Sequence, residues 1–225
     1  MKFKKSLIIL ALLCLPFSAM ATSNIICQNP LLRGDSLDSK LFLVREKLSF
    51  DRDLLNLVFK TLSAPSVNEN LKNFLVDAIS DSTIGFEFMN EPSVTEGLYH
   101  PTPGGNSSAL ILLKKNPPEK MFQYLVHELA HHQFKGFYIG NEKLIKRVFQ
   151  GKEVDSLWSQ LTEVFAGISE EIFMSNMISL GLKSNSKTDV NQRIVMLMKH
   201  SKVEPLNVLL GKMREEALKV IHLNH

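Results

Sequence analysis

Cysteine is nearly absent from this chain of 225 residues, which contains only two. Cys14 falls in an N-terminal segment that we expect to be removed, so the mature chain keeps Cys27 alone. A single thiol cannot form an internal disulfide, and the fold must therefore be stabilised by its core. We expect Cys27 to be an inert or intermolecular thiol. The alternative is an inhibitory thiolate that reaches a metal site.

The chain also lacks an N-terminal apolar run long enough for an ordinary membrane span. The run at residues 6–16 (SLIILALLCLP) follows lysines at positions 2, 4 and 5 and precedes the triplet Ala19-Met20-Ala21. A basic start, a short apolar segment and a small-x-small triplet are typical of a secretory signal peptide. We predict a signal peptide over residues 1–21, and hence a secreted or periplasmic protein without a stable membrane anchor after cleavage. The alternative is an uncleaved N-terminal anchor.

An excess of charge of one sign is missing as well. Residues 1–21 carry three of the 26 basic residues and none of the 23 acidic residues, so the rest of the chain is formally neutral. Neutral charge does not favour a nucleic acid or an anionic membrane as the partner. Internal repeats and low-complexity segments are absent too. We predict one domain over residues 22–225, which are enough for a well-buried core, and a monomer.

Helical periodicity dominates what is present. Apolar residues recur at spacings of three and four. This pattern predicts helices within residues 37–80, 155–180, 189–200 and 204–223, and a short one within 141–150.

Two short runs rich in β-forming residues predict strands at residues 83–89 and 109–115. The proline- and glycine-rich stretch at 91–107 between them is predicted to be a long loop or a loose hairpin. With Tyr99 and His100 it could form a lip over a cleft, or it could be a plain connection. The elements together predict an α+β fold, mainly helical, with a small antiparallel sheet.

A buried helix is predicted directly after the second strand. Asn116-Pro117-Pro118-Glu119 offers an N-cap side chain, a proline for the first helical position and an acid in the first turn. Gly136 predicts the end of this helix. Apolar residues occupy most sides of it, as expected for a buried helix: Met121, Phe122, Leu125, Val126, Leu129, Ala130 and Phe134.

Inside this helix the sequence reads His-Glu-Leu-Ala-His at residues 127–131. Histidines four residues apart lie one turn above each other, so His127 and His131 can both reach one metal ion. Glu128 lies beside them and stays free to accept a proton from a water molecule at the metal. Polar groups in a buried helix need partners, and a metal ion would serve all three. The alternative is a chance pattern of incidental surface histidines.

Catalytic zinc usually takes a third protein ligand, and Glu163 in the next helix is the best donor. Ala166 and Gly167, three and four residues later, are small, and so is Ala130 on the motif helix. Small residues would let the two helices approach until the carboxylate meets both imidazoles. The rival donors are Glu170, two turns further along the same stripe, and Asp155 and His200.

Two neighbouring features refine this interpretation. Phe134 and Phe137 occupy the positions where metzincins need a glycine and a third histidine, so a metzincin site is excluded. His132 lies about 100° around the helix from His131. We therefore expect His132 to support the site from outside or to lie at the surface.

These residues resemble the gluzincin group of zincin-fold metallopeptidases. The resemblance rests on His127-Glu128-Leu129-Ala130-His131, on Thr162-Glu163-Val164-Phe165-Ala166, and on the strand just before the motif helix. It covers roughly residues 83–180. It implies a zincin-like domain in which His127, His131 and Glu163 bind one catalytic Zn²⁺ ion and Glu128 is the catalytic acid/base.

The resemblance also implies that the strand at 109–115 presents an open edge to an extended peptide. Many gluzincins add a downstream histidine or tyrosine that donates to the tetrahedral intermediate. Tyr138 and His200 are candidates here, although no motif identifies either.

The function expected from these residues is that of a secreted zinc-dependent peptidase. It would hydrolyse peptide bonds with a zinc-activated water and Glu128 as the general base, and its partner would be a peptide or protein substrate. One alternative is a catalytically silent zincin-fold binding protein, which would have no need of Glu128. The other is a helical exported protein with incidental histidines.

Overall fold

The computed structural model describes residues 36–89, 96–101, 109–149, 154–183 and 187–222. It divides into two units, Met1–Phe42 and Leu43–His225. The predicted signal peptide and Cys27 lie outside the described residues, so neither prediction is tested. The helix α2 (Leu37–Lys47) begins in the first unit, while the sheet and all later helices belong to the second.

Two helices precede the sheet, α3 (Arg52–Ser63) and α4 (Glu69–Ser80). The Asp51 side chain caps α3 by accepting a hydrogen bond from the Leu54 N–H at 2.8 Å. Asn68 caps α4 in the same way, accepting from the N–H groups of Asn70 and Leu71. Short polar side chains satisfy the free N–H groups of a first helical turn, which explains where both helices begin.

The sheet is mixed rather than purely antiparallel. Its strands are β1 (Ile84–Phe88), β2 (Gly97–Pro101) and β3 (Ala109–Leu113), in the order β1-β3-β2. β3 runs parallel to β1, from Ile84↔Ala109 to Phe88↔Leu113, and antiparallel to β2, from Gly97↔Leu113 to Pro101↔Ala109.

The residue types explain why β3 is central and β2 is not. β3 (ALILL) is apolar on both faces, with alternate residues fully buried, as suits a strand that has neighbours on both sides. β2 (GLYHP) is mostly exposed and ends in Pro101, which is tolerated at a sheet edge because it lacks an N–H group. The expectation that the strand at 109–115 offers an open edge is therefore wrong. Within the stretch predicted as a long loop or a loose hairpin, β2 pairs antiparallel with β3, as a hairpin does.

The motif helix, α5, runs from Pro118 to Phe149. Pro118 is the first helical residue, as predicted, but the Asn116 side chain donates to Glu96 (2.8 Å) and to the Lys114 carbonyl rather than capping the helix. The predicted end at Gly136 is wrong, because α5 continues through it and absorbs the short helix expected at 141–150.

Burial explains why α5 passes through Gly136. The only described glycine with positive φ is Gly181, so Gly136 does not adopt the left-handed conformation of a helix end. A glycine inside a helix costs about 1 kcal/mol relative to alanine. Beyond it, Phe137, Ile145 and Phe149 are buried, and each apolar side chain of this size contributes about 1.5–3 kcal/mol. The second half of α5 thus gains more than the glycine costs.

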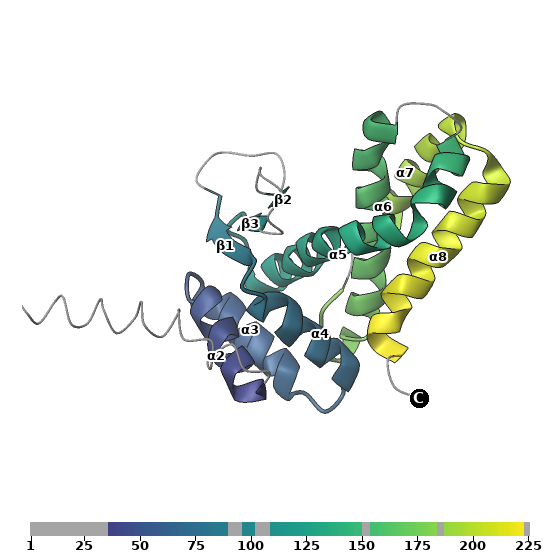
Figure 1. Ribbon diagram of the computed structural model, residues 1–225. Helices are drawn as coiled ribbons and strands as arrows, with labels where there is room; N and C mark the ends of the chain where they lie inside the picture. Colours follow the sequence, from purple (N-terminus) through teal and green to yellow (C-terminus); the bar gives the residue numbers. More distant parts are fainter. Residues whose placement is uncertain (1–35, 90–95, 102–108, 150–153, 184–186, 223–225) are drawn as a thin grey trace, which may run out of the picture. The chain divides into compact units, whose positions relative to one another are not determined.

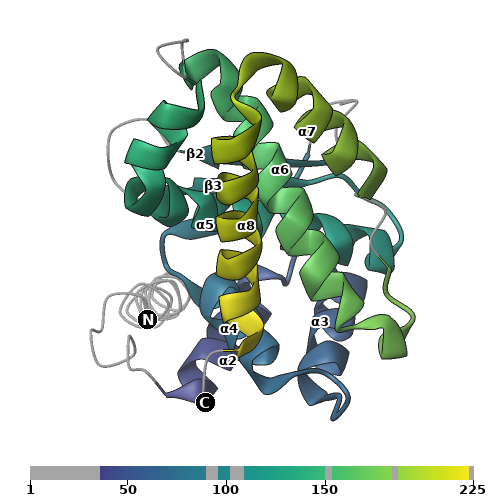
Figure 2. The same cartoon turned by 90° about the vertical axis from the view of Figure 1, so that its right-hand side faces the viewer.

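The remaining helices are α6 (Val154–Ser175), the 3₁₀ turn η2 (Ile178–Leu180), α7 (Lys187–His200) and α8 (Val203–His222). α6 packs against α5, α7 and α8, as Figures 1 and 2 show. α6 ends at Ser175, earlier than the helix predicted at 155–180. α7 and α8 agree with the helices predicted at 189–200 and 204–223. None of the helices in the described part combines the length and the apolar character that a membrane crossing needs.

α5 takes part in both hydrophobic cores of this unit. Its first half, from Met121 to Leu129, packs with α3, α4 and the sheet. Its second half, from Ala130 to Phe149, packs with α6, α7 and α8. Residues 127–131 lie where the two cores meet along α5, so residues of both cores pack around this part of the helix. The α+β class, mainly helical with a small sheet, is confirmed.

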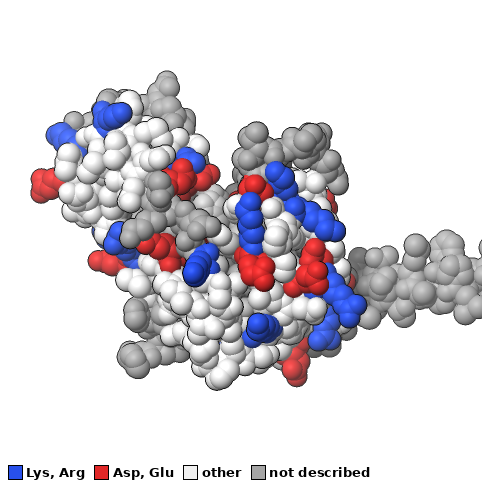
Figure 3. All heavy atoms as spheres, turned by 180° about the vertical axis from the view of Figure 1, so that it is seen from behind, with Lys and Arg blue, Asp and Glu red and all other residues white. Residues whose placement is uncertain are grey.

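Charged side chains of both signs lie on the surface. On the face drawn in Figure 3, Lys and Arg side chains are interspersed with Asp and Glu, and no broad patch of one sign forms among the described residues. Such a face offers no electrostatic attraction for a polyanion.

Candidate metal centre

Three side chains of α5 form a group that could hold a metal ion. One ligand atom from each of His127, Glu128 and His131 lies within 4.8 Å of the others. The two imidazole rings are 4.9 Å apart at their centroids and nearly perpendicular, at 78°. Their spacing of four residues on a straight helix produces this proximity, as the sequence predicts.

α6 brings Glu163 to both imidazoles. Glu163 Oε2 lies 3.5 Å from His127 Nε2, and Glu163 Oε1 lies 3.6 Å from His131 Nε2. The small residues Ala130 and Ala166 are both fully buried in the core that α5 and α6 share. The structure thus brings the expected third donor to the pair, with the Nε2 atom of each ring facing the same carboxylate. Its role as a ligand stays a prediction.

Glu170 occupies a different position from the one expected of a rival ligand. Its Oε2 lies 3.0 Å from His127 Nδ1, on the side of the ring away from Glu163, and its Oε1 accepts a hydrogen bond from Gln123 Nε2 at 2.7 Å. When His127 Nδ1–H donates to this carboxylate, the neutral ring keeps the Nε2 lone pair free for a metal ion. Glu170 therefore orients the ring and selects the tautomer that a metal requires.

The two histidines of the group differ in charge at neutral pH, because the pKa of His127 is raised and the pKa of His131 is lowered. Burial opposes protonation of His127, but the Glu163 and Glu170 carboxylates outweigh it and raise its pKa to about 10. Burial and the positive charge at His127 lower the pKa of His131 to about 4. Burial opposes ionisation of Glu163, yet the hydrogen bond to His127 and the charges of both histidines and Arg193 lower its pKa to about 2.

Glu128 is enclosed beside the imidazoles. It is 4% exposed, and its Oε2 lies 4.0 Å from His131 Nε2. Burial is the main reason that its pKa rises to about 7, although a hydrogen bond from the Tyr99 backbone opposes the rise. Gly97 lies directly against its carboxyl group, since a Cβ atom at that position would be 2.5 Å from Glu128 Oε1. A carboxylate poised near neutral pH is suited to proton transfer.

His132 connects β2 to the rest of the site without facing the other two histidines. Its Nδ1 lies 3.1 Å from the Tyr99 hydroxyl, and its Nε2 lies 3.8 Å from Asp81 Oδ2. The Tyr99 ring also stacks on His131, with 6.2 Å between the centroids. This agrees with the expectation that His132 supports the site from outside.

Arg193 of α7 is a neighbour that the sequence analysis missed. Its Nη2 lies 3.7 Å from Glu163 Oε2, while its Nε donates to Asp189 at 2.7 Å and its Nη1 to Gln160 at 3.1 Å. The spacing of four between Asp189 and Arg193 predicts a helix ion pair, but no local pattern indicates the contact with Glu163.

The other candidates lie elsewhere or are not described. Tyr138 packs its ring against Trp158 (4.5 Å between centroids) and Phe134 in the second core. His200 is exposed at the end of α7. The Asp155 side chain lies outside the described residues. The geometry therefore offers no contact between the metal group and either residue considered for stabilising the tetrahedral intermediate.

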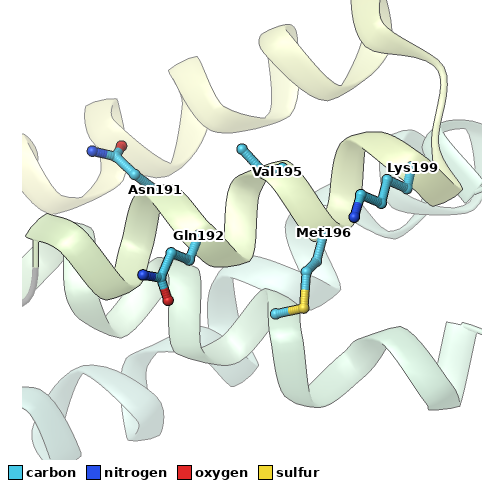
Figure 4. A pocket seen from close by; sticks show the side chains of 5 residues that line it. All are labelled: Asn191, Gln192, Val195, Met196 and Lys199. Carbon is cyan, nitrogen blue, oxygen red and sulfur yellow. The ribbon is translucent and has the colours of Figure 1, made fainter.

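A surface pocket of about 490 Å³ lies on the outer side of α7, away from Arg193. Figure 4 shows its lining side chains along one face of that helix: Asn191, Gln192, Val195, Met196 and Lys199. Its lining contains no histidine or carboxylate, unlike the group on α5 that could hold a metal ion.

The donor set fits Zn²⁺. Two imidazole nitrogens and a carboxylate from a neighbouring helix are the ligand types of catalytic zinc sites, and the Nδ1 contact of His127 with a buried carboxylate supplies the usual outer partner. The site is accessible, because His127 is 17% and Glu163 30% exposed.

No family model, curated protein or solved structure matches the chain. The membership in the gluzincins therefore stays a prediction. The fold and the site define a coarser class. The chain is an α+β protein with a His-Glu-x-x-His group that could bind a metal ion.

Proposed function

We propose that this protein is an exported zinc-dependent peptidase of the gluzincin type. The observation that supports it most is the convergence of two Nε2 atoms on the Glu163 carboxylate, within 3.6 Å, beside a buried Glu128. An incidental pair of histidines would not need a ring-orienting carboxylate such as Glu170 on the opposite nitrogen. In this proposal His127, His131 and Glu163 bind the ion.

Zinc at this position would polarise the scissile carbonyl and acidify the attacking water. Glu128 accepts the proton of that water and then delivers it to the leaving amine, a task suited to a pKa of about 7. Glu170 keeps the His127 ring in place during both steps. The partial exposure of Glu163 leaves the site open to a substrate.

β2 supports a peptide as the substrate. Among the described strands it pairs only with β3, so its other edge faces away from the sheet, and the Tyr99 backbone hydrogen-bonds to Glu128. The same strand touches Glu128 through Gly97. An extended peptide that pairs with this edge would run past the general base, and its backbone would bind largely independently of its side chains.

The test uses protein purified after export. Zinc per chain is measured first, and then cleavage of a mixed peptide library with and without a chelator. We expect one zinc ion per chain, chelator-sensitive hydrolysis, and a Glu128→Gln variant that keeps the zinc but loses hydrolysis. Zinc binding without any cleavage would favour a binding protein instead, and the absence of zinc would favour incidental histidines.

A further inference from the structure

We propose that β2 positions the Glu128 carboxylate. Gly97 makes the contact with the carboxylate. A chain of side-chain contacts, from Tyr99 through His132 to Asp81, holds the strand in place. This inference rests on the proposed function, since it assigns a role in orienting its general base. None of these residues is a metal ligand in that proposal. They act through Glu128.

Gly97 allows the backbone of β2 to lie against the whole carboxyl group. A Cβ atom there would be 2.5 Å from Glu128 Oε1, 3.0 Å from Cγ and 3.1 Å from Cδ. The first distance is far below van der Waals contact, and the other two leave little room to adjust. A side chain at this position must therefore move the carboxylate or the strand against it, and Glu128 is almost fully enclosed.

Tyr99 faces α5 from the same side of β2 as Gly97, because residues two apart on a strand share a face. Its backbone hydrogen-bonds to the Glu128 carboxylate. Its ring stacks on His131. Thus β2 holds Glu128 at two adjacent points, one steric and one polar.

The Tyr99 hydroxyl then fastens β2 to two other elements. It lies 3.1 Å from His132 Nδ1 on α5, and His132 Nε2 faces Asp81 Oδ2 at 3.8 Å just after α4. Asp81 is itself held, because its Oδ1 accepts hydrogen bonds from the Thr83 N–H (2.8 Å) and the Thr83 hydroxyl (2.7 Å). The chain therefore adds a second connection between this edge strand, which pairs with β3 and packs on α5, and the helix that carries the catalytic residues.

The effect on catalysis follows from how strictly proton transfer depends on distance. A displacement of about 1 Å at a reacting group can cost about 100-fold in rate. The close contact at Gly97 means that an added Cβ atom changes the position of the carboxylate relative to β2. Zinc binding should be insensitive, because the three atoms nearest to a Cβ at Gly97 all belong to Glu128, which is not a ligand in the proposal.

The test compares Gly97→Ala with Gly85→Ala on β1. A Cβ atom at Gly85 would meet the flexible end of Leu110 at 3.1 Å and no residue of the site, so it is a matched change in the same sheet. We expect Gly97→Ala to lose about 100-fold in kcat with unchanged zinc affinity and little change in KM. Gly85→Ala should retain the original kcat. Wild-type kcat in Gly97→Ala would overturn the proposal.

A second measurement needs no turnover. In zinc-free protein, hydrogen–deuterium exchange at the Tyr99 amide should accelerate in Gly97→Ala and in Glu128→Ala, because each removes or moves the acceptor. Unchanged protection in both variants overturns the positioning role. Absence of hydrolysis in the wild type, with exchange accelerated as expected, would instead reject the proposed function alone.

If the Gly97→Ala variant does not fold, the Tyr99→Phe variant tests the positioning role instead. It removes only the hydroxyl and keeps the ring and the backbone group. We expect a smaller fall in kcat, faster exchange of the β2 amides and unchanged zinc affinity. A variant that loses stability but keeps full kcat would show that the chain is merely structural and would overturn the proposal.

Discussion

Glu170→Gln is the most direct test of the geometry around the metal group. The Glu170 carboxylate accepts two hydrogen bonds, one from His127 Nδ1 at 3.0 Å and one from Gln123 Nε2 at 2.7 Å. Glutamine has the same shape but only one acceptor oxygen. The new NH₂ group faces either His127 Nδ1–H or Gln123, whose amide must then turn over to accept, and in both cases His127 loses its charged acceptor.

The size of the effect can be estimated from this loss. Removing an outer partner of a metal-ligating histidine typically costs 10- to 100-fold in metal affinity, and the 2% exposure of Glu170 suggests the upper part of that range. We expect zinc affinity to fall by about 50-fold, or about 2.3 kcal/mol. Water cannot replace the lost acceptor at so buried a position.

The assay is competition for zinc against a chromophoric chelator of known affinity, with circular dichroism to check that the variant is folded. Glu171→Gln is the matched control, because Glu171 is the next residue on α6 and is only partly buried. An equal loss of affinity in Glu171→Gln would show a nonspecific charge effect. Unchanged affinity in Glu170→Gln would refute the inference that Glu170 orients His127.

Three further predictions concern stability. The pKa of His127 is raised from 6.5 to about 10, with burial opposing the rise and the two carboxylates causing it. His127 therefore stabilises the zinc-free protein fully below pH 6.5, and this contribution disappears as the pH rises towards 10; chelator-treated protein should lose stability over that window in urea titrations. Ala166→Leu would force α5 and α6 apart, so we expect a loss of about 1–3 kcal/mol together with weaker zinc binding; full affinity would contradict the close packing. Gly136→Ala should raise the free energy of unfolding by about 0.5–1 kcal/mol, because the glycine is helical and a Cβ atom there meets nothing within 4 Å; destabilisation would contradict a continuous α5.

Several parts of the fold could be read from local patterns. The helices at 52–63, 69–80, 187–200 and 203–222 follow apolar periodicity, and α5 begins at Pro118 as its first-turn residues indicate. The pairing of His127 with His131 also follows from helix geometry alone. These features depend on residues a few positions apart, where the backbone determines which side chains meet.

Local patterns were insufficient where distant burial decides the outcome. Gly136 is a plausible helix end when taken alone, but the apolar residues after it pack into the second core and extend α5. β2 has weak strand character, and its position at the edge of a mixed sheet depends on β3 inserting beside β1. Glu163 and Glu170 share one stripe of α6, so their different roles could not be distinguished by periodicity.

By itself, then, the sequence determined the helix that carries the His-Glu-x-x-His motif and predicted the next helix with its candidate donor Glu163. Only the tertiary structure decided which atoms of that second helix face which nitrogen of His127, and that Gly97, His132 and Arg193 surround the group. The physical reason is the separation along the sequence between the residues that each kind of contact joins. Helix periodicity relates residues within one or two turns, whereas the contacts at Glu128 and Glu163 join segments that meet only when both cores are formed.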